Sequence, residues 1–354
     1  MTAAIRRTAR RRPELLGLGA LLLAGVLLVA VGIRFITGPL AVLALSLILA
    51  SIAMLILVAI TGTPETRRKL APYGLLKPGM LWLALFYLAP LFTLLRLSLS
   101  TLPNRFAVEA EFGPTLDNYI TAFTDFRPQF ERAFMYSATA TILTILIGYP
   151  LAYVIAFRGG KYRTLLLGLV VIPFFTSFLI RTIAWKSILS DQGFVTNAID
   201  GVGLTWLFEA LNIMQSGKLI NTPAAVIFGL TYNFLPFMIL PIYVSLEKID
   251  VRLVDAAKDL YSTSTSAFRK IVVPLSIPGV FAGTLLTFIP AAGDFINADY
   301  LGNPNTTMIG NSIQDQFLVQ NNVPLASAMS FVLMFIITVF VLIYSKFFGT
   351  EDLA

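Results

Sequence analysis

The chain has few residues that could carry out chemistry, and the commonest catalytic types are missing. It contains no cysteine and no histidine. This excludes disulfides, thiol nucleophiles, zinc fingers, histidine acid–base catalysis and haem ligation by histidine. The nearest matches to a phosphate-binding loop, Gly159-Gly160-Lys161 and Gly217-Lys218, lack its upstream glycine and its following Ser or Thr. We therefore expect no catalytic residue, no metal site and no bound cofactor in this chain.

Charged side chains within long apolar segments are costly and often functional. Here there are four: Arg96, Arg181, Lys186 and Asp294. Asp294 is the candidate for binding a cationic ligand. Four aromatic residues could supply cation–π faces beside it: Phe175, Trp185, Tyr232 and Phe234. Two purely structural interpretations stay open. Asp294 could form an ion pair with Arg181, which lies at similar depth, and the aromatic residues could simply fill the core.

The segments that hold these residues are long and apolar. Of the 354 residues 57% are hydrophobic and 13% charged, whereas soluble domains are about one quarter charged. The mean hydropathy of +0.81 agrees with an all-α integral membrane protein. A spanning helix needs about 20 apolar residues. Eight segments qualify: Leu15–Ile33, Pro39–Ile60, Pro78–Ser98, Ala133–Phe157, Thr164–Leu189, Pro223–Leu246, Leu275–Ala298 and Leu325–Phe347.

Prolines inside the predicted segments include Pro90, Pro150, Pro173, Pro236, Pro241 and Pro290. Such kinks are tolerated in membranes where neighbouring helices or water satisfy the freed carbonyls.

The distribution of Lys and Arg predicts that both termini are cytoplasmic. With the N-terminus inside, 18 basic residues fall on inside segments and 5 on outside ones. The net charge of +7 follows from this bias and needs no nucleic-acid partner. The first segment resembles a signal peptide, but its apolar run is long and a second span follows directly, so we interpret it as a retained anchor.

The cytoplasmic loop at 248–274 differs from the other, short and basic connections. Leu253, Ala256, Ala257 and Leu260 recur at helical spacing and form one apolar stripe. A Ser/Thr run then predicts the cap of a second short helix, with a stripe of Ala267, Phe268, Ile271 and Val272, which Pro274 would end. The mixed charge favours burial against a protein partner modestly over a lipid surface.

Asp255-Ala256-Ala257, followed by Ile271-Val272-Val273-Pro274-Leu275, resembles the E-A-A-x-x-x-G…I-x-L-P sequence of permease subunits of ABC importers. Asp255 replaces the usual Glu, and Tyr261 stands where Gly is usual. Further segments resemble the spermidine/putrescine permeases: Pro173–Arg181 with Ala184-Trp185, Leu235–Lys248, Ile289–Phe295, Leu301-Gly302 and Met308–Asn311. The resemblance covers about residues 75–347.

This resemblance implies a six-helix type I permease core over 75–347. Before it come a basic segment and two extra spanning helices (1–74), and after it a short cytoplasmic tail (348–354). It also implies that the loop docks on a separate ABC ATPase through a set of ten residues: Asp255, Ala256, Ala257, Lys258, Leu260, Tyr261, Ala267, Phe268, Ile271 and Pro274. The implied partners are an ATPase homodimer that carries ATP and Mg²⁺, a second permease subunit and an extracytoplasmic binding protein.

The function implied is import of spermidine, putrescine or a related organic cation across the inner (plasma) membrane. The alternative is a gradient-driven transporter without an ATPase. The few charges within the spans make a relay across the bilayer hard to build, and this alternative leaves the loop at 248–274 unexplained. A membrane scaffold explains neither the loop nor the ordered set of matching segments.

Overall fold

The computed structural model describes residues 76, 79–80, 82–103 and 110–348. The predicted spans Leu15–Ile33 and Pro39–Ile60 and the cytoplasmic tail beyond residue 348 lie outside these residues. The chain divides into two compact units, Met1–Leu94 and Leu95–Ala354. In the first unit the described residues include the helical turn η2 (Ala84–Leu88) and most of α5 (Ala89–Ser98), which ends in the second unit.

The second unit is helical, and its described residues contain isolated bridges but no extended strand. This confirms the all-α class. In chain order after α5, its elements begin with α6 (Asp117–Asp125), α7 (Arg127–Tyr153), η3 (Val154–Arg158), η4 (Gly160–Tyr162), α8 (Arg163–Val171), η5 (Ile172–Phe175), α9 (Phe178–Ile188), α10 (Phe194–Val202) and α11 (Thr205–Ala210). They are followed by α12 (Pro223–Glu247), α13 (Val251–Asp259), α14 (Ser264–Ala267), η6 (Phe268–Val272), α15 (Val273–Ala292), α16 (Ile296–Leu301), η7 (Pro304–Thr306), α17 (Ile309–Leu318) and α18 (Val323–Phe348).

Four described helices are long and apolar enough to cross a membrane: Arg127–Arg158, Pro223–Glu247, Ser264–Ala292 and Val323–Lys346. The chain is therefore a multi-pass membrane protein by length and composition. α12 begins where the sequence provides a cap, because Thr222 Oγ1 accepts a hydrogen bond from the backbone N–H of Ala225 and Pro223 fills the first turn. Prolines at 150, 236, 241 and 290 lie inside these helices, as predicted.

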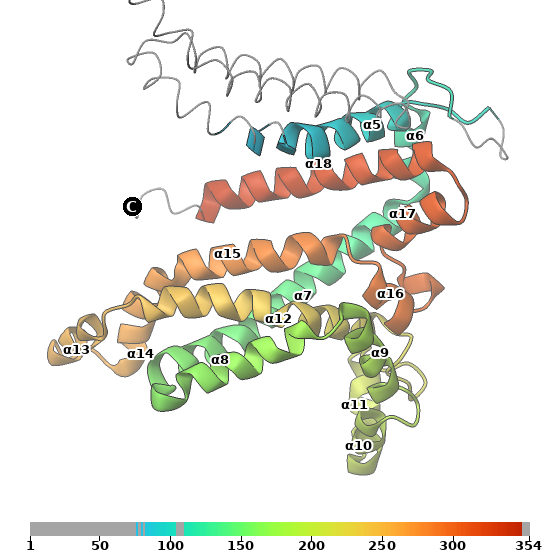
Figure 1. The fold of residues 1–354 in the computed structure, drawn as a ribbon. Helices are drawn as coiled ribbons and strands as arrows, with labels where there is room; N and C mark the ends of the chain where they lie inside the picture. Colours follow the sequence, from blue (N-terminus) through green and yellow to red (C-terminus); the bar gives the residue numbers. More distant parts are fainter. Residues whose placement is uncertain (1–75, 77–78, 81, 104–109, 349–354) are drawn as a thin grey trace, which may run out of the picture. The chain divides into compact units, whose positions relative to one another are not determined.

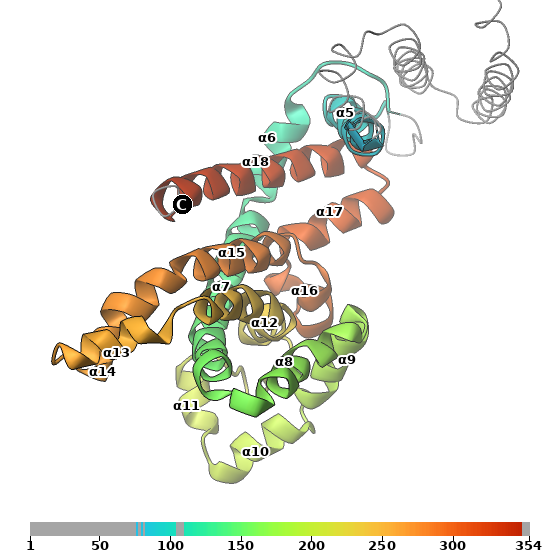
Figure 2. The same ribbon diagram turned by 60° about the vertical axis from the view of Figure 1, so that its left-hand side comes forward.

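α12 packs against both α7 and α15, and α7 also contacts α15. In Figure 1 α12 and α15 run side by side, whereas α7 crosses both obliquely, and the crossing of α7 and α15 is also visible in Figure 2. The helices approach closely because glycines face the contact. A Cβ atom at Gly279 of α15 would lie 2.6 Å from the Pro241 carbonyl oxygen of α12 and 2.6 Å from Ser245 Cβ. Small residues of this kind are typical of helix contacts in membranes, where dispersion forces between closely fitted surfaces drive association.

The predicted span Thr164–Leu189 is not one continuous helix, and its break is sharper than the kink expected at Pro173. The chain runs as a helix over Gly160–Phe175, breaks, and continues as α9 at an angle of 94°. Thr176 and Ser177 are extended at the break, directly after Pro173 and two phenylalanines. Proline fixes its own φ and removes a backbone hydrogen-bond donor. Here the helical hydrogen bonds end shortly after Pro173, and the chain changes direction instead of continuing as a kinked helix.

The predicted span Leu275–Ala298 is also wrong in its bounds, because α15 ends at Ala292 and α16 is a separate helix. At the other end Pro274 does not stop a short helix as expected. One continuous helix runs from Ser264 to Ala292. The wider turn η6 precedes Pro274, with the Val273 N–H bonded to the Phe268 carbonyl five residues back. This wider turn accommodates the proline inside the helix.

Candidate functional site

The loop helix α13 (Val251–Asp259) begins after an N-cap residue, Asp250. Asp250 Oδ1 accepts a hydrogen bond from the Arg252 N–H at 3.0 Å and so starts the helix. Its apolar stripe is open: Leu253 is 50% exposed and Leu260 82% exposed. Asp255 is exposed and reaches only Lys258, at 3.4 Å. The predicted first stripe is therefore present and no described part of this chain covers it.

The turn after α13 explains why glycine is usual at position 261 in the resembling family. Tyr261 has φ of +59°, in the left-handed region. The Tyr261 N–H bonds to the Lys258 carbonyl at 2.9 Å and the Ser262 N–H to the Ala257 carbonyl at 3.0 Å, which closes the helix end. A residue with a Cβ is strained there, and the Tyr261 ring is 99% exposed, so the ring gains little by packing.

The second predicted stripe is not open. Ala267 and Val272 are buried, and Phe268 packs edge-on against Tyr149 and Tyr153 of α7 at 6.0 and 5.5 Å between ring centroids. The expectation that both stripes need an external partner is thus wrong for the second. Phe268 and Val272 belong to one core cluster, Ala267 is buried and Ile271 is half-buried, because this segment forms the start of the long helix Ser264–Ala292. Thr263 caps it, as predicted for the Ser/Thr run.

Asp294 lies in the loop between α15 and α16, beyond the end of the spanning helix, and is 8% exposed. One carboxylate oxygen, Oδ2, accepts hydrogen bonds from the backbone N–H of Asn297 at 2.8 Å and from its side-chain amide at 3.2 Å. The other oxygen has no hydrogen bond among the described residues. Burial raises the pKa of Asp294 to about 6, against the lowering effect of the Asn297 donors.

A buried chain of amides links Asp294 to two further helices. Asn233 of α12 donates through Nδ2 to Asn297 Oδ1 at 3.0 Å and to Thr182 Oγ1 of α9 at 3.2 Å. Asn233, Asn297 and Thr182 are each at most 1% exposed. Because a buried polar group must find partners, this hydrogen-bond network fixes α9, α12 and α16 relative to one another around the carboxylate of Asp294.

The ion pair between Arg181 and Asp294, one of the two readings open from sequence, is absent from the described contacts. The Arg181 guanidinium instead lies over the rings of Phe174 and Phe178, at 5.4 and 5.7 Å from their centroids. Asp294 therefore keeps its negative charge available when it is ionised.

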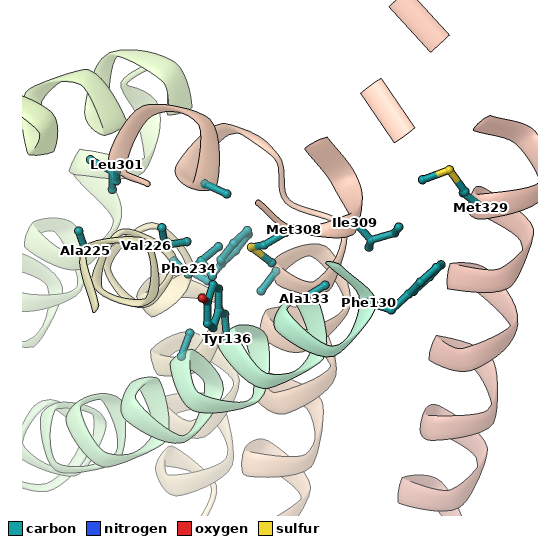
Figure 3. Packing of buried hydrophobic residues seen from close by; sticks show 14 of the residues in the cluster. Phe130, Ala133, Tyr136, Ala225, Val226, Phe234, Leu301, Met308, Ile309 and Met329 are labelled. Carbon is teal, nitrogen blue, oxygen red and sulfur yellow. The ribbon is translucent and has the colours of Figure 1, made fainter. Parts of the chain in front are cut away.

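The four aromatic candidates do not gather into one cage. Phe234 is in the core, beside Phe178 and among buried side chains that include Val226, Tyr136 and Met308 (Figure 3). Trp185 and Tyr232 pack edge to face, with ring centroids 5.1 Å apart. Phe175 is 84% exposed at the break before α9. Packing thus accounts for Phe234, while Trp185, Tyr232 and Phe175 stay candidates.

The sequence interpretation missed Asn233 and Asn297. A signal was present, because an asparagine inside an apolar span and another three residues after an isolated Asp are polar groups that need partners. Gly310 was quoted only as part of a resemblance. A Cβ there would lie 2.6 Å from the Gly293 carbonyl oxygen, so this glycine lets α17 approach the Asp294 loop.

Comparison with known proteins agrees with this arrangement. Residues 144–348 match the family described as "Binding-protein-dependent transport system inner membrane component". The chain is 38% identical over 266 residues to the spermidine/putrescine transport system permease protein PotB of Haemophilus influenzae, covering 75% of this chain and 90% of that protein. It is 36% identical to the PotB protein of Escherichia coli K12, covering 74% of this chain and 92% of that one.

Among solved structures, a bacterial ABC transporter involved in the import of the acidic polysaccharide alginate aligns with a TM-score of 0.58 and 19% identity. It covers 81% of this chain and 98% of the other. That likeness shows the fold. The sequence matches show that this chain belongs to the inner-membrane permease components of binding-protein-dependent ABC transport systems.

Proposed function

We propose that this chain is one of two permease subunits of an ATP-driven importer for polyamines or a related organic cation. The observation that carries the ATP-driven part is the open stripe of α13, which lies within the E-A-A-like segment and has no cover among the described residues. The cargo is inferred from relatives named as spermidine/putrescine permeases, which this chain matches over about nine tenths of their length. Asp294 suits a cationic cargo.

The proposed assembly has eight spans with both termini cytoplasmic, in the inner membrane. A homodimeric ATPase, which would supply ATP and Mg²⁺, would dock on the loop at 248–274, and a second permease would complete the pathway. An extracytoplasmic binding protein would deliver the cargo. Within this assembly the two N-terminal segments would act as an anchor or as lateral support for the core.

A mechanical link supports the coupling role. Ser264–Ala292 is one helix of 29 residues, about 44 Å long at 1.5 Å per residue. It starts three residues after Tyr261 at the loop and ends two residues before Asp294. A displacement of the loop by the ATPase would therefore reach the Asp294 end directly, and the amide chain would pass it on to α9 and α12.

The test is co-purification of the chain with the products of its neighbouring genes. The loop variant is Leu253→Glu with Leu260→Glu, because these side chains are exposed and Phe268 is part of the chain's own core. The matched control is Leu318→Glu with Val319→Glu, two exposed residues at the end of α17. We expect an ATPase with wild type and control and its loss from the loop variant.

The other outcomes are equally definite. Retention of the ATPase by the loop variant would place docking elsewhere. If no ATPase binds wild type, the ATP-driven proposal falls and the gradient-driven alternative takes its place. Uptake of labelled spermidine and putrescine into vesicles that hold the intact complex and ATP tests the cargo separately, and no uptake of either cation would overturn it.

A further inference from the structure

A polar pocket of about 420 Å³ lies between α16, α17 and the junction of α6 with α7. In both ribbon views α16 and α17 lie beyond the end of α15 that is remote from α13 and α14 (Figures 1 and 2). Helical spacing turns one polar face of α17 toward the pocket, because Asn311, Gln314 and Asp315 recur at i, i+3 and i+4. Asp299 of α16 and Phe126 line the pocket as well. Residues far apart in the sequence thus form one cavity.

Four polar side chains that line the pocket make no hydrogen bond and no ion pair within the described part of the chain. They are Asp299, Ser312, Gln314 and Asp315. By contrast, the amide of the neighbouring Asn311 is paired through both its oxygen and its nitrogen. Ligand pockets combine a concave surface with converging polar groups of this kind. The cavity with its unpaired hydroxyl and amide therefore indicates a polar ligand independently of the two charges.

The charges on the lining are both negative, and no described Lys or Arg lines the pocket. Arg132 borders it, because its guanidinium donates to the Thr307 carbonyl oxygen at 3.2 Å and to Thr307 Oγ1 at 3.4 Å. Lys186 lies over the ring of Tyr300, which is not a lining residue, at 5.8 Å. Neither cation makes an ion pair with the two carboxylates. The lining therefore favours a cation, and Phe126 offers a ring for its methylene groups.

Asn311 joins the wall of the pocket to the Asp294 loop. Its Nδ2 donates to the carbonyl oxygen of Phe295, the residue after Asp294, at 2.8 Å, and its Oδ1 accepts from the Met308 N–H at 3.1 Å. A Cβ at Gly310 would lie 2.7 Å from the Asp294 carbonyl oxygen, so α17 begins directly against this loop. Asp294 is not a lining residue of the pocket, so the two carboxylate sites are neighbouring and distinct.

We propose that this pocket is a second binding site for a multiply charged alkylammonium ion, with its ammonium groups against Asp299 and Asp315 and its methylene chain against Phe126. A Lys or Arg side chain of a docked protein is the rival occupant. It carries one charge, whereas the pocket holds two unpaired carboxylates, so an ion with two or more ammonium groups satisfies the lining better.

In the transport cycle the pocket would hold the cation before it reaches Asp294. This step, and the use of spermidine as the ion, rest on the proposed function. The preference of the pocket for cations rests on its own lining.

The first test measures the charge of the pocket at a single thiol. Ser312→Cys supplies one, because the chain has no cysteine, and Asn305→Cys is the reference position, exposed and outside the lining. The purified complete transporter is treated with trimethylammonium-ethyl or sulfonatoethyl methanethiosulfonate, and the peptides that hold positions 312 and 305 are weighed. We expect the ratio of cationic to anionic rates to be about tenfold higher at 312 than at 305. Equal ratios would overturn the proposal.

Charge variants locate the source of this preference. Asp299→Asn with Asp315→Asn, in the Ser312→Cys chain, should lower the ratio at 312 to the value at 305. The matched control is Asp200→Asn with Glu209→Gln, which neutralises two exposed carboxylates on α10 and α11 and should leave the ratio unchanged. An equal effect of the two double variants would show that the general surface charge, not the pocket, attracts the reagent, and would overturn the proposal.

The second test measures occupancy with spermidine as the probe. Spermidine should slow the reaction of Ser312→Cys with neutral methyl methanethiosulfonate, and sodium chloride at equal ionic strength should not. Asp299→Asn with Asp315→Asn should abolish this protection. No protection by spermidine, or protection by the extracytoplasmic binding protein alone, would overturn the proposal, and the latter would assign the pocket to protein docking.

Uptake separates this inference from the proposed function. In vesicles that hold the complete transporter, Asp299→Asn with Asp315→Asn should raise the KM for spermidine about fivefold or more at a nearly unchanged maximal rate, because binding and not translocation is lost. Wild-type uptake of spermidine without protection at 312 would keep the proposed function and overturn the pocket. Protection at 312 without any uptake would support the pocket and overturn the proposed cargo.

Discussion

Asp294 is an ionisable group whose burial lowers the free energy of unfolding when the carboxyl group is ionised. Its pKa is raised from 3.8 to about 6 by burial, although two donors from Asn297 stabilise the charged form. A carboxylate with a raised pKa is more stable in its protonated form, so the folded state loses stability as pH rises from about 4 through 6. Carboxylates retained at such a cost are frequent at functional sites.

We expect Asp294→Asn to be more stable than wild type by up to about 3 kcal/mol at pH 7.5 and by only about half as much at pH 5. The amide keeps an oxygen for the Asn297 donors and removes the ionisation. Thermal unfolding of the purified complex at the two pH values measures this. Uptake of a cationic cargo should fall about tenfold or more with the lost charge. Uptake at the wild-type rate would show that Asp294 is not part of the pathway.

At the scale of elements, the loop and the long helix have different roles. α13 presents its stripe outward, whereas α14 and η6 are the beginning of the helix that continues as α15. The E-A-A-like segment therefore belongs to the exposed helix, and the I-x-L-P-like segment belongs to the core-packed one. Under the proposed function, the two pieces of this sequence pattern would act separately, the first in docking and the second in transmission.

We expect Tyr261→Gly to stabilise the end of α13, because glycine adopts φ of +59° without the cost of a Cβ, about 1 kcal/mol. Hydrogen exchange of the Leu260–Ser262 amides should slow by about fivefold, in proportion to that free energy. Tyr261→Ala is the control, because it removes the exposed ring and keeps the Cβ. Equal exchange in the glycine and alanine variants would show that strain at 261 is negligible.

The contact of α15 with α12 makes a second prediction. Gly279→Ala places a methyl group 2.6 Å from the Pro241 carbonyl oxygen and should destabilise the protein by about 1–3 kcal/mol. Gly168→Ala is the matched control, because the nearest atom to its Cβ, Ile172 Cδ1, is 4.0 Å away. The thermal midpoint of the purified protein should fall only for the first. A similar fall for both would show that the close contact at Gly279 is not the cause, because helix propensity alone favours alanine over glycine.

At the scale of the whole molecule, orientation decides which end of the long helix Ser264–Ala292 faces the cytoplasm, where the proposed ATPase would dock. The excess of Lys and Arg predicts that position 265 is cytoplasmic and position 305 extracytoplasmic. Because the chain has no cysteine, Thr265→Cys and Asn305→Cys are single labelling sites. An impermeant maleimide should label 305 in intact spheroplasts and 265 only after permeabilisation. The reverse pattern would invert the proposed topology.

The fold by itself does not determine the charge of the cargo. A transporter involved in the import of an acidic polysaccharide shares this architecture at 19% identity. Similarity to the spermidine/putrescine permeases at 36–38% identity is the stronger guide to the cargo. Under the proposed function, side chains such as Asp294 would contribute to the preference within a common scaffold.

The sequence by itself determined the class of the protein and several of its elements. The apolar segments Pro223–Leu246 and Leu325–Phe347 match α12 and α18 to within two residues, because a bilayer demands about 20 apolar residues whatever the tertiary contacts are. The α13 stripe was also readable, since helical spacing is a local property. Tyr261 was noted as unusual from the sequence, and its left-handed φ gives the physical reason.

Tertiary structure alone decided where helices break and which polar groups meet. The helix ends shortly after Pro173, whereas Pro274 lies within a continuous helix. The wider turn η6 directly precedes Pro274, and Pro173 instead lies in the tight turn η5. Phe268 turned inward because Tyr149 and Tyr153 of α7 offer it a packing surface. Asp294 accepts hydrogen bonds from Asn297, three positions away, and Asn297 in turn accepts one from Asn233, which reaches it only after α12 and α16 pack together. Long-range pairing of this kind leaves no periodic trace in a single sequence.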